Sequence, residues 1–123
     1  MNINSNVNFF LGLQCQIKIF HWQTKGYARH NAFDMVLGEL LPLVDSFVED
    51  AMGKYGRFKL DDETNTIRLA NLNELDPKTM IKSVCAALIQ YTQQFDETDT
   101  NLLNIRDEIL GDVNKTLYLF TLQ

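Results

Sequence analysis

The chain has 123 residues, 46% of them hydrophobic, and a formal net charge of −5 at pH 7. This length fits one domain, residues 1–123, and is sufficient for a four-helix core. The negative net charge argues against electrostatic binding to DNA. No Lys or Arg precedes Lys18, so the N-terminus does not form a basic tail. No apolar run is long enough to cross a membrane, and the polar start MNINSNVN is unlike a signal peptide. We therefore expect a cytoplasmic protein, in the host cytoplasm if the gene is viral.

Residues 5–25 have the pattern of a first helix. Ser5 suits its N-cap, and Gly26 suits the position just past its C-terminus. The cysteines Cys15 and Cys85 lie in apolar helical stretches and are expected to be buried, reduced thiols. The inner face of this first helix recurs at helical spacing and comprises Phe10, Leu13, Ile17, Phe20 and His21. A histidine therefore continues an apolar stripe at the end of the helix.

A second helix is expected from Ala28 to Tyr55, ended by Gly56. Pro42 lies inside it, and proline removes one helical hydrogen bond and clashes with the preceding turn. We expect a kink at Pro42 rather than a break, because the polar pattern described below keeps its phase across it. Two separate helices are the alternative.

Residues 57–75 form a long connection to a third helix that begins at Asp76-Pro77, where Asp suits the N-cap and Pro the first turn. In a bundle, such a connection is a crossover that runs along the length of the helices. We expect one short helix within it, near residues 69–74.

Two further helices complete the chain, over about residues 77–95 and from the turn at 96–100 to about residue 121. Because this turn is short, the two helices are predicted to be antiparallel neighbours. Their inner faces are predicted to comprise Ile81, Val84, Leu88, Tyr91 and Phe95, then Leu102, Ile105, Ile109, Val113, Leu117 and Phe120. The sequence therefore predicts an all-α, ferritin-like four-helix bundle with one long crossover between the second and third helices.

The second helix carries polar residues that share one side with apolar ones. At 100° per residue, His30, Asp34 and Asp45 fall at about 0°, 40° and 60°. Glu49 falls at about 100° on the same count. The apolar residues on this side are Leu37, Leu41 and Val48, at about −20°, 20° and 0°. Carboxylates on an apolar stripe need a cation or a donor, and a His/Asp/Glu set facing inward indicates a metal site.

One chain cannot close this site alone. His30 and Asp34 form one i,i+4 pair, and Asp45 and Glu49 form another. The midpoints of the two pairs lie about 22 Å apart along the helix at 1.5 Å per residue. A two-fold axis near Pro42 would place the first pair of one chain against the second pair of an antiparallel copy. We therefore expect an isologous homodimer with two equivalent sites.

This pattern resembles Dps, the ferritin-like proteins of starved bacteria. Their first helix ends in His-Trp followed by a Gly, as at His21-Trp22 and Gly26 in this chain. Their second helix carries a His, an Asp four residues on, an Asp eleven further and a Glu four further, and the same intervals occur here. The link between the two histidines is a few residues shorter than is usual in that family. The resemblance implies ferroxidase ligands shared across a two-fold dimer interface, namely His21, His30, Asp34, Asp45 and Glu49.

The resemblance also implies a function. It implies oxidation of ferrous iron by hydrogen peroxide or oxygen, and a dodecameric shell that stores the ferric mineral. It implies that Trp22 lies beside the iron and donates electrons, although the ordinary role of a tryptophan is packing. Asp96, Glu97 and Asp99 are interpreted as a solvated turn, with an ion pore of the shell as the alternative. The ligand types do not choose between iron, zinc and manganese.

The alternative function is that of a non-enzymatic helical oligomer. Such an assembly or accessory protein would keep the fold and a structural or vestigial metal site. The chain contains no Glu-x-x-His, which excludes the intra-bundle di-iron site of other ferritin-like proteins, and no CxxC or glycine-rich phosphate loop. The two hypotheses differ in their response to ferrous iron, because only the first predicts its turnover.

Overall fold

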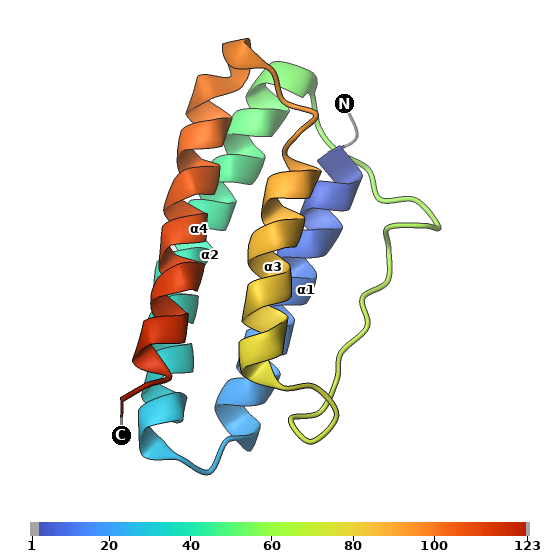
Figure 1. Ribbon diagram of the computed structural model, residues 1–123. Helices are drawn as coiled ribbons and strands as arrows, with labels where there is room; N and C mark the ends of the chain where they lie inside the picture. The colour runs from blue at the N-terminus through green and yellow to red at the C-terminus, as the bar shows by residue number, and fades with distance from the viewer. Residues whose placement is uncertain (1–2, 123) are drawn as a thin grey trace.

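The computed structural model describes residues 3–122, with the side chain of Tyr91 left outside the description. Within that range, all regular structure is helical. The elements are α1 (Ile3–Gln23), α2 (Tyr27–Tyr55), α3 (Pro77–Tyr91), the short 3₁₀ helix η1 (Glu97–Asp99) and α4 (Thr100–Leu119). The four long helices pack side by side as a bundle (Figure 1).

The chain passes up and down the bundle in a defined order. α1 and α2 are antiparallel, and residues 56–76 then run back along the outside of the bundle before α3 and α4 form a second antiparallel pair (Figure 1). α2 packs against α1 and α4, and α3 packs against α4 and α1. α2 and α3 are therefore parallel and joined by one crossover, which is the ferritin-like connectivity. The fold predicted from the sequence is confirmed.

Apart from Tyr91, whose side chain is not described, the residues of the predicted inner faces are buried or packed against the core, which also contains an aromatic layer. Phe10, Phe33 and Phe47 are each at most 1% exposed. The rings of Phe10 and Phe47 meet edge to face at 5.2 Å, and those of Phe33 and Phe120 at 5.4 Å. Burial of each such side chain stabilises the fold by roughly 1.5–3 kcal/mol. These contacts fix α2 between α1 and α4, and so fix which side of α2 remains outside.

Several predicted boundaries are wrong by up to four residues. α1 already includes Ser5, so Ser5 is not its N-cap. Gly26 has φ −90° and serves as the N-cap of α2, not as a left-handed terminator of α1. α3 ends at Tyr91 and α4 at Leu119, before the predicted residues 95 and 121. Gly56, with φ 91°, ends α2 as predicted.

Pro42 does not divide the second helix, because α2 is continuous from Tyr27 to Tyr55. The prediction of one helix rather than two is confirmed. The two pairs of candidate ligands therefore lie on a single rigid element. None of the helices formed by residues 3–122 combines the length and hydrophobicity needed to span a bilayer.

The crossover contains no helix, so the short helix predicted at residues 69–74 is wrong. Amide side chains of α1 instead form hydrogen bonds with backbone groups of the crossover. Asn8 donates to the carbonyls of Thr64 and Thr66, and Gln16 both donates to the carbonyl of Ala70 and accepts from its N–H. The segment adds two hydrogen-bonded turns of its own, at residues 61–64 and 71–75, so its backbone groups are satisfied partly by α1 and partly within the segment.

Candidate metal site and its exposed face

His21 and His30 are brought together by the short link between α1 and α2. Their rings stack with centroids 3.9 Å apart and planes 24° apart. Nδ1 of His21 lies 3.1 Å from the carbonyl oxygen of His30, and Nδ1 of His30 lies 3.0 Å from the carbonyl oxygen of His21. A carbonyl can only accept, so each Nδ1 carries the proton. With Nδ1 in this role, Nε2 is the ring nitrogen that a metal can take.

The carboxylates do not face inward, and this corrects the sequence prediction. Asp34, Asp45 and Glu49 are all exposed in the single chain. On the angular scale used above, the buried Phe33 and Val44 fall at about −60° and −40°. The side of α2 that packs against the core is therefore rotated away from the polar residues. Those residues lie on the adjacent side of the helix, which faces outward. Their exposure means that a single chain does not desolvate them.

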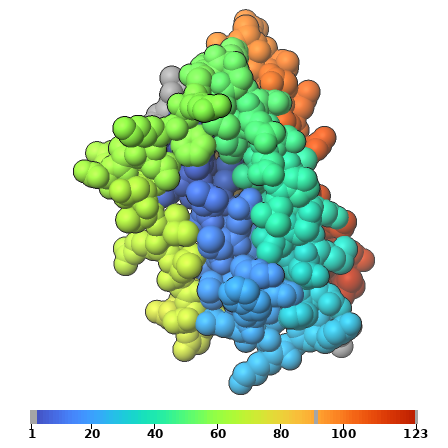
Figure 2. All heavy atoms as spheres, turned by 180° about the vertical axis from the view of Figure 1, so that it is seen from behind, coloured from blue at the N-terminus to red at the C-terminus, as the bar shows by residue number. Residues whose placement is uncertain are grey.

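An apolar strip accompanies these carboxylates on the outside of α1 and α2. Leu11 and Leu41, 43% and 46% exposed, line a groove of about 390 Å³ together with Asp45 and Val48. Trp22 is 66% exposed at the end of α1. Figure 2 shows this side of the molecule, with α1 between α2 and the crossover. We name this surface the α1–α2 face, comprising Leu11, Lys18, Trp22, Asp34, Leu41, Asp45, Val48 and Glu49.

The six candidate residues are only partly assembled in one chain. The structure brings His21 and His30 together, with Asp34 one turn further along α2. Asp45 and Glu49 lie towards the other end of the same helix. Trp22 is adjacent to His21 and has the Lys18 ammonium 5.4 Å from its ring centroid. Among residues 3–122 of a single chain, no cluster of three or more His, Cys, Asp or Glu side chains is placed to hold a metal ion.

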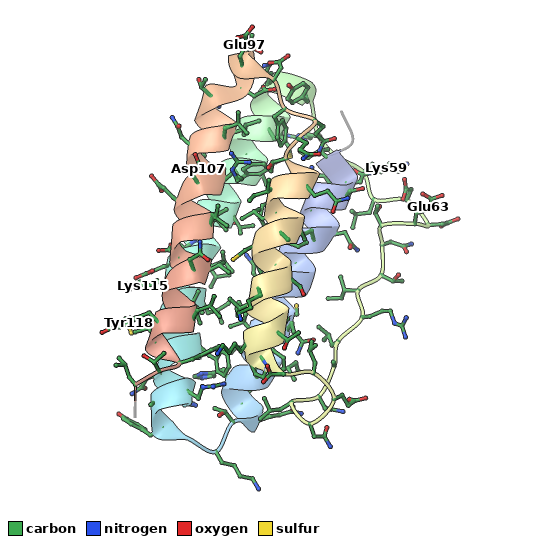
Figure 3. The ribbon with its side chains drawn as sticks, in the orientation of Figure 1. Lys59, Glu63, Glu97, Asp107, Lys115 and Tyr118 are labelled. Atoms are coloured by element: carbon green, nitrogen blue, oxygen red, sulfur yellow. The ribbon has the colours of Figure 1, made fainter. Side chains whose placement is uncertain are left out.

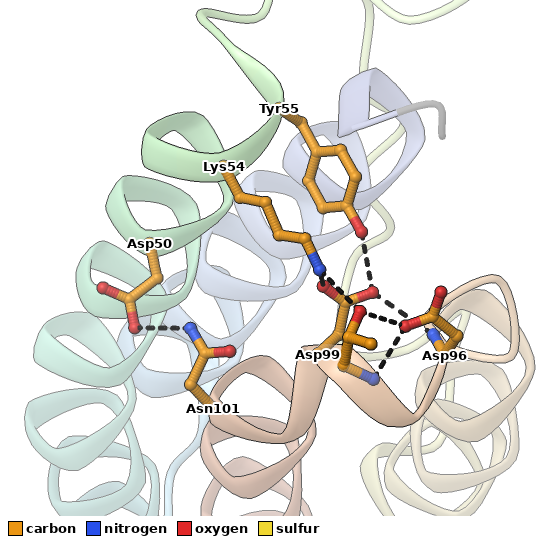
Figure 4. A network of polar contacts seen from close by, with 7 residues as sticks. Asp50, Lys54, Tyr55, Asp96, Asp99 and Asn101 are labelled. Atoms are coloured by element: carbon orange, nitrogen blue, oxygen red, sulfur yellow. Dashed lines mark hydrogen bonds and ion pairs between the residues drawn. The ribbon is translucent and has the colours of Figure 1, made fainter.

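A polar network that the sequence did not reveal closes the opposite end of the bundle. The Asp99 carboxylate is buried and accepts from the Lys54 ammonium, the Tyr55 hydroxyl and the Asp96 backbone N–H (Figure 4). These hydrogen bonds, from Lys54 first, lower the pKa of Asp99. The interpretation of residues 96–99 as a solvated turn is therefore wrong for Asp99, which joins the end of α2 to the start of α4.

Two acids also meet between α2 and α4. Asp112 is half-buried beside Glu39, and burial followed by the hydrogen bond and charge of Glu39 raises the pKa of Asp112 to about 6. The Lys115 ammonium lies 3.6 Å from Glu39. Glu39 and Asp112 lie on different helices and meet only because α2 packs against α4. The periodicity of the sequence therefore did not indicate this pair.

Two comparisons with known proteins bear on this chain. A family of unknown function, DUF5856, matches residues 21–120, a segment that begins at His21 and includes all six candidate residues. A protein of Enterobacteria phage T4, named as an uncharacterized 14.6 kDa protein in the mobD-ri intergenic region, is 30% identical over 123 residues. The match covers 97% of this chain and 91% of the phage protein. No solved structure matches the chain.

Proposed function

The chain belongs to the DUF5856 family of unknown function, and we propose that it binds and oxidises ferrous iron at a site shared between two chains. In this proposal His21, His30 and Asp34 come from one chain and Asp45 and Glu49 from its partner. The oxidant is hydrogen peroxide or oxygen, and the setting is the cytoplasm, as expected from the sequence.

The observation that carries the proposal is the order of side chains on the α1–α2 face. Leu41 lies between the pair His30 and Asp34 and the pair Asp45 and Glu49 on α2, and it shares a groove with Leu11 of α1. A two-fold axis through this apolar middle brings the histidine-containing end of one face onto the acidic end of the other. A face that is complementary to its own rotated copy is what an isologous dimer requires.

The charges on this face support the same pairing. Lys18 is one turn before Trp22 on α1, with its ammonium beside the Trp22 ring. The two-fold rotation would bring its ammonium towards Asp45 and Glu49 of the partner. Burial of exposed Leu11, Leu41 and Trp22 in the same contact would add hydrophobic stabilisation, which scales with the apolar area removed from water. The charge pairing favours the antiparallel arrangement over a parallel one, and the apolar burial stabilises the contact.

The donor set suits iron as a substrate. Three carboxylates offset the charge of the bound cation, and two neutral imidazoles with free Nε2 atoms supply borderline nitrogen ligands. Coverage by the partner would remove the carboxylates from water and strengthen their interaction with the cation. In the reaction with peroxide, two Fe²⁺ ions each give up one electron, the O–O bond breaks, and water supplies the remaining oxygen as ferric oxyhydroxide forms and protons leave.

An anaerobic titration with Fe(II), followed by a pulse of hydrogen peroxide, tests the proposal. We expect saturable binding at about one or two irons per chain and fast growth of ferric absorbance after the pulse. Saturable binding of Zn(II) with no turnover of Fe(II) would favour a structural site in a helical oligomer. Absence of saturable binding by any of Fe(II), Zn(II) and Mn(II) would overturn the proposed site.

A further inference from the structure

Another groove lies on a different side of α1, beneath the crossover. It has a volume of about 450 Å³ and is bounded by α1, the crossover and the start of α3. None of its lining residues belongs to the α1–α2 face, so the groove does not depend on the proposed metal site. A volume of this size and a mainly apolar lining are typical of small-molecule sites. The apolar side chains of the lining are Phe9, Leu13, Ile67, Leu75, Met80 and Val84.

The crossover is held above this groove at two points. Asn8 donates to the carbonyls of Thr64 and Thr66 at one end. Gln16 bonds to the N–H and the carbonyl of Ala70 at the other end. Asn8 and Gln16 are separated by about 12 Å along the axis of α1, at 1.5 Å per residue. The groove is therefore elongated along α1, and its outer wall is fixed at both ends.

Gly12 forms the floor of the groove, midway between these two anchors. It is an interior residue of α1, where glycine is destabilising relative to alanine. Packing does not require a glycine here, since the nearest atom to an added Cβ would be Cγ2 of Ile67, at an ordinary 3.8 Å. The missing side chain at residue 12 thus keeps the groove open.

Arg68 supplies a positive charge to this groove. Among the described residues that line it, Arg68 alone is charged, and it is exposed on the crossover. Within residues 3–122, none of the ion pairs includes Arg68. Figure 3 shows Glu63, an acid of the same segment, at the outer tip of the crossover and directed away from α1. A guanidinium binds a carboxylate through two parallel N–H···O bonds, so this cation is available to an anionic ligand.

We propose that this groove binds a free fatty acid of medium chain length. The unbranched alkyl chain lies over Gly12, between α1 and the crossover, and the carboxylate pairs with the Arg68 guanidinium. An elongated groove fits a linear chain, and a cation without a carboxylate partner selects an anion over a neutral or cationic amphiphile. The alkyl chain provides most of the affinity, because the hydrophobic contribution grows with each methylene group removed from water.

Titration of the protein with decanoate, without added metal and followed by two-dimensional amide NMR, tests the proposal. Below the concentration at which decanoate forms micelles, we expect saturable shifts of the signals of Gly12, Ile67 and Arg68. Decanol has the same chain but no charge. It should bind about three- to fivefold more weakly, which is the size expected for the loss of one exposed ion pair.

A variant that fills the groove tests the position of the alkyl chain. Gly12→Leu places a side chain on the floor of the groove and should abolish saturable binding of decanoate. The matched change Gly111→Leu is in α4, where an added Cβ meets nothing within 4 Å, and should bind decanoate as the parent does. Far-UV circular dichroism checks that both proteins keep their helix content.

A second variant tests the carboxylate contact, and it changes only an exposed residue. Arg68→Gln should bind decanoate about three- to fivefold more weakly and decanol as the parent does. The control Arg57→Gln, at an exposed residue outside the groove lining, should match the parent for both ligands. Equal affinity of the parent for decanoate and decanol, or full binding by a folded Gly12→Leu protein, would overturn the proposal. So would shifts confined to the groove of Leu11 and Leu41, since the ligand would then occupy the α1–α2 face.

Discussion

The stacked histidines show how two residues can be positioned by their own backbone. Each Nδ1 donates to the carbonyl of the other histidine, so both rings are held in one orientation without help from a carboxylate. Hydrogen bonds of this kind fix the tautomer of a metal-binding histidine. The three-residue link 24–26 is short enough to enforce the pairing. The shorter connection, compared with Dps, thus does not separate His21 from His30.

Asp112 provides a residue-scale prediction of pH dependence. Its pKa of about 6 in the folded chain lies above the ordinary 3.8, because burial and Glu39 disfavour the charged form. The folded state therefore binds more protons than the unfolded state between these values, and stability falls as pH rises through this range. The destabilisation is absent below about pH 3.8 and complete above about pH 6.

We predict that Asp112→Asn raises the free energy of unfolding by about 0.5 kcal/mol near neutral pH, after discounting the shift for solvent screening of a partly exposed group. The gain should vanish as the pH approaches the ordinary pKa of Asp. Urea denaturation of both proteins at several pH values measures the difference. The matched change Asp62→Asn, at an exposed residue of the crossover, should have no such pH profile. An equal gain at every pH would refute the assigned cause.

At the scale of elements, α1 replaces the secondary structure that the crossover lacks. Asn4, Asn8 and Gln16 lie on one stripe of α1 and bond to crossover backbone from Lys59 to Ala70. Gly12 falls in the same stripe, and a Cβ at this position would lie 3.8 Å from Cγ2 of Ile67. A Cβ at this position would make an ordinary van der Waals contact, so the amides, and not the glycine, hold the crossover on this stripe. The crossover is held by side chains of a neighbouring helix.

We predict that Gln16→Ala lowers the free energy of unfolding by about 1–2 kcal/mol, because it leaves both the N–H and the carbonyl of Ala70 without their buried partner. Gln23 accepts from the backbone N–H of Leu72 and donates to the side chain of Asn71, but it is exposed, so water can replace it. The matched change Gln23→Ala should lower the free energy by about 0.5 kcal/mol or less. Urea denaturation and amide exchange of Ala70 measure both. Equal losses would contradict the role of the stripe.

The fold was largely predictable from the sequence because each helix has a clear apolar stripe, and the break at Asp76-Pro77 marks the third helix. The errors lie where tertiary contacts decide. Instead of the helix expected at residues 69–74, the chain forms a single hydrogen-bonded turn at residues 71–75, and Gln16 and Gln23 bond to the N–H groups of Ala70 and Leu72. Asp34 and Asp45 were predicted to face inward, and they face outward. Helical periodicity shows which residues share a side of α2, but it does not show which of two adjacent sides packs against the core. The Asp99 network requires contacts between α2 and α4, which no local pattern reveals.

At the scale of the whole molecule, the proposed dimer depends on the α1–α2 face. Leu41 lies at the middle of this face and is 46% exposed in the single chain. Ile89 of α3 is also 46% exposed but lies outside this face. The two residues therefore form a matched pair for testing where the second chain binds.

We predict that Leu41→Lys converts the dimer to a monomer with unchanged helix content, because two lysines would meet near the two-fold axis in place of two leucines. Ile89→Lys should leave the dimer intact. Sedimentation equilibrium at high salt, with far-UV circular dichroism as the check on folding, measures both. A Leu41→Lys protein that remains dimeric would place the interface elsewhere.

The most direct test of a metal site shared between two chains is complementation in mixed dimers. His30→Ala and Asp45→Ala should each abolish saturable Fe(II) binding when present alone, with helix content retained. When the two variants are unfolded, mixed in equal amounts and refolded, each mixed dimer should contain one site with both ligands intact, so about a quarter of all sites should bind iron again. Recovery at that level would support ligands from two chains. Failure to recover any binding would contradict the shared site.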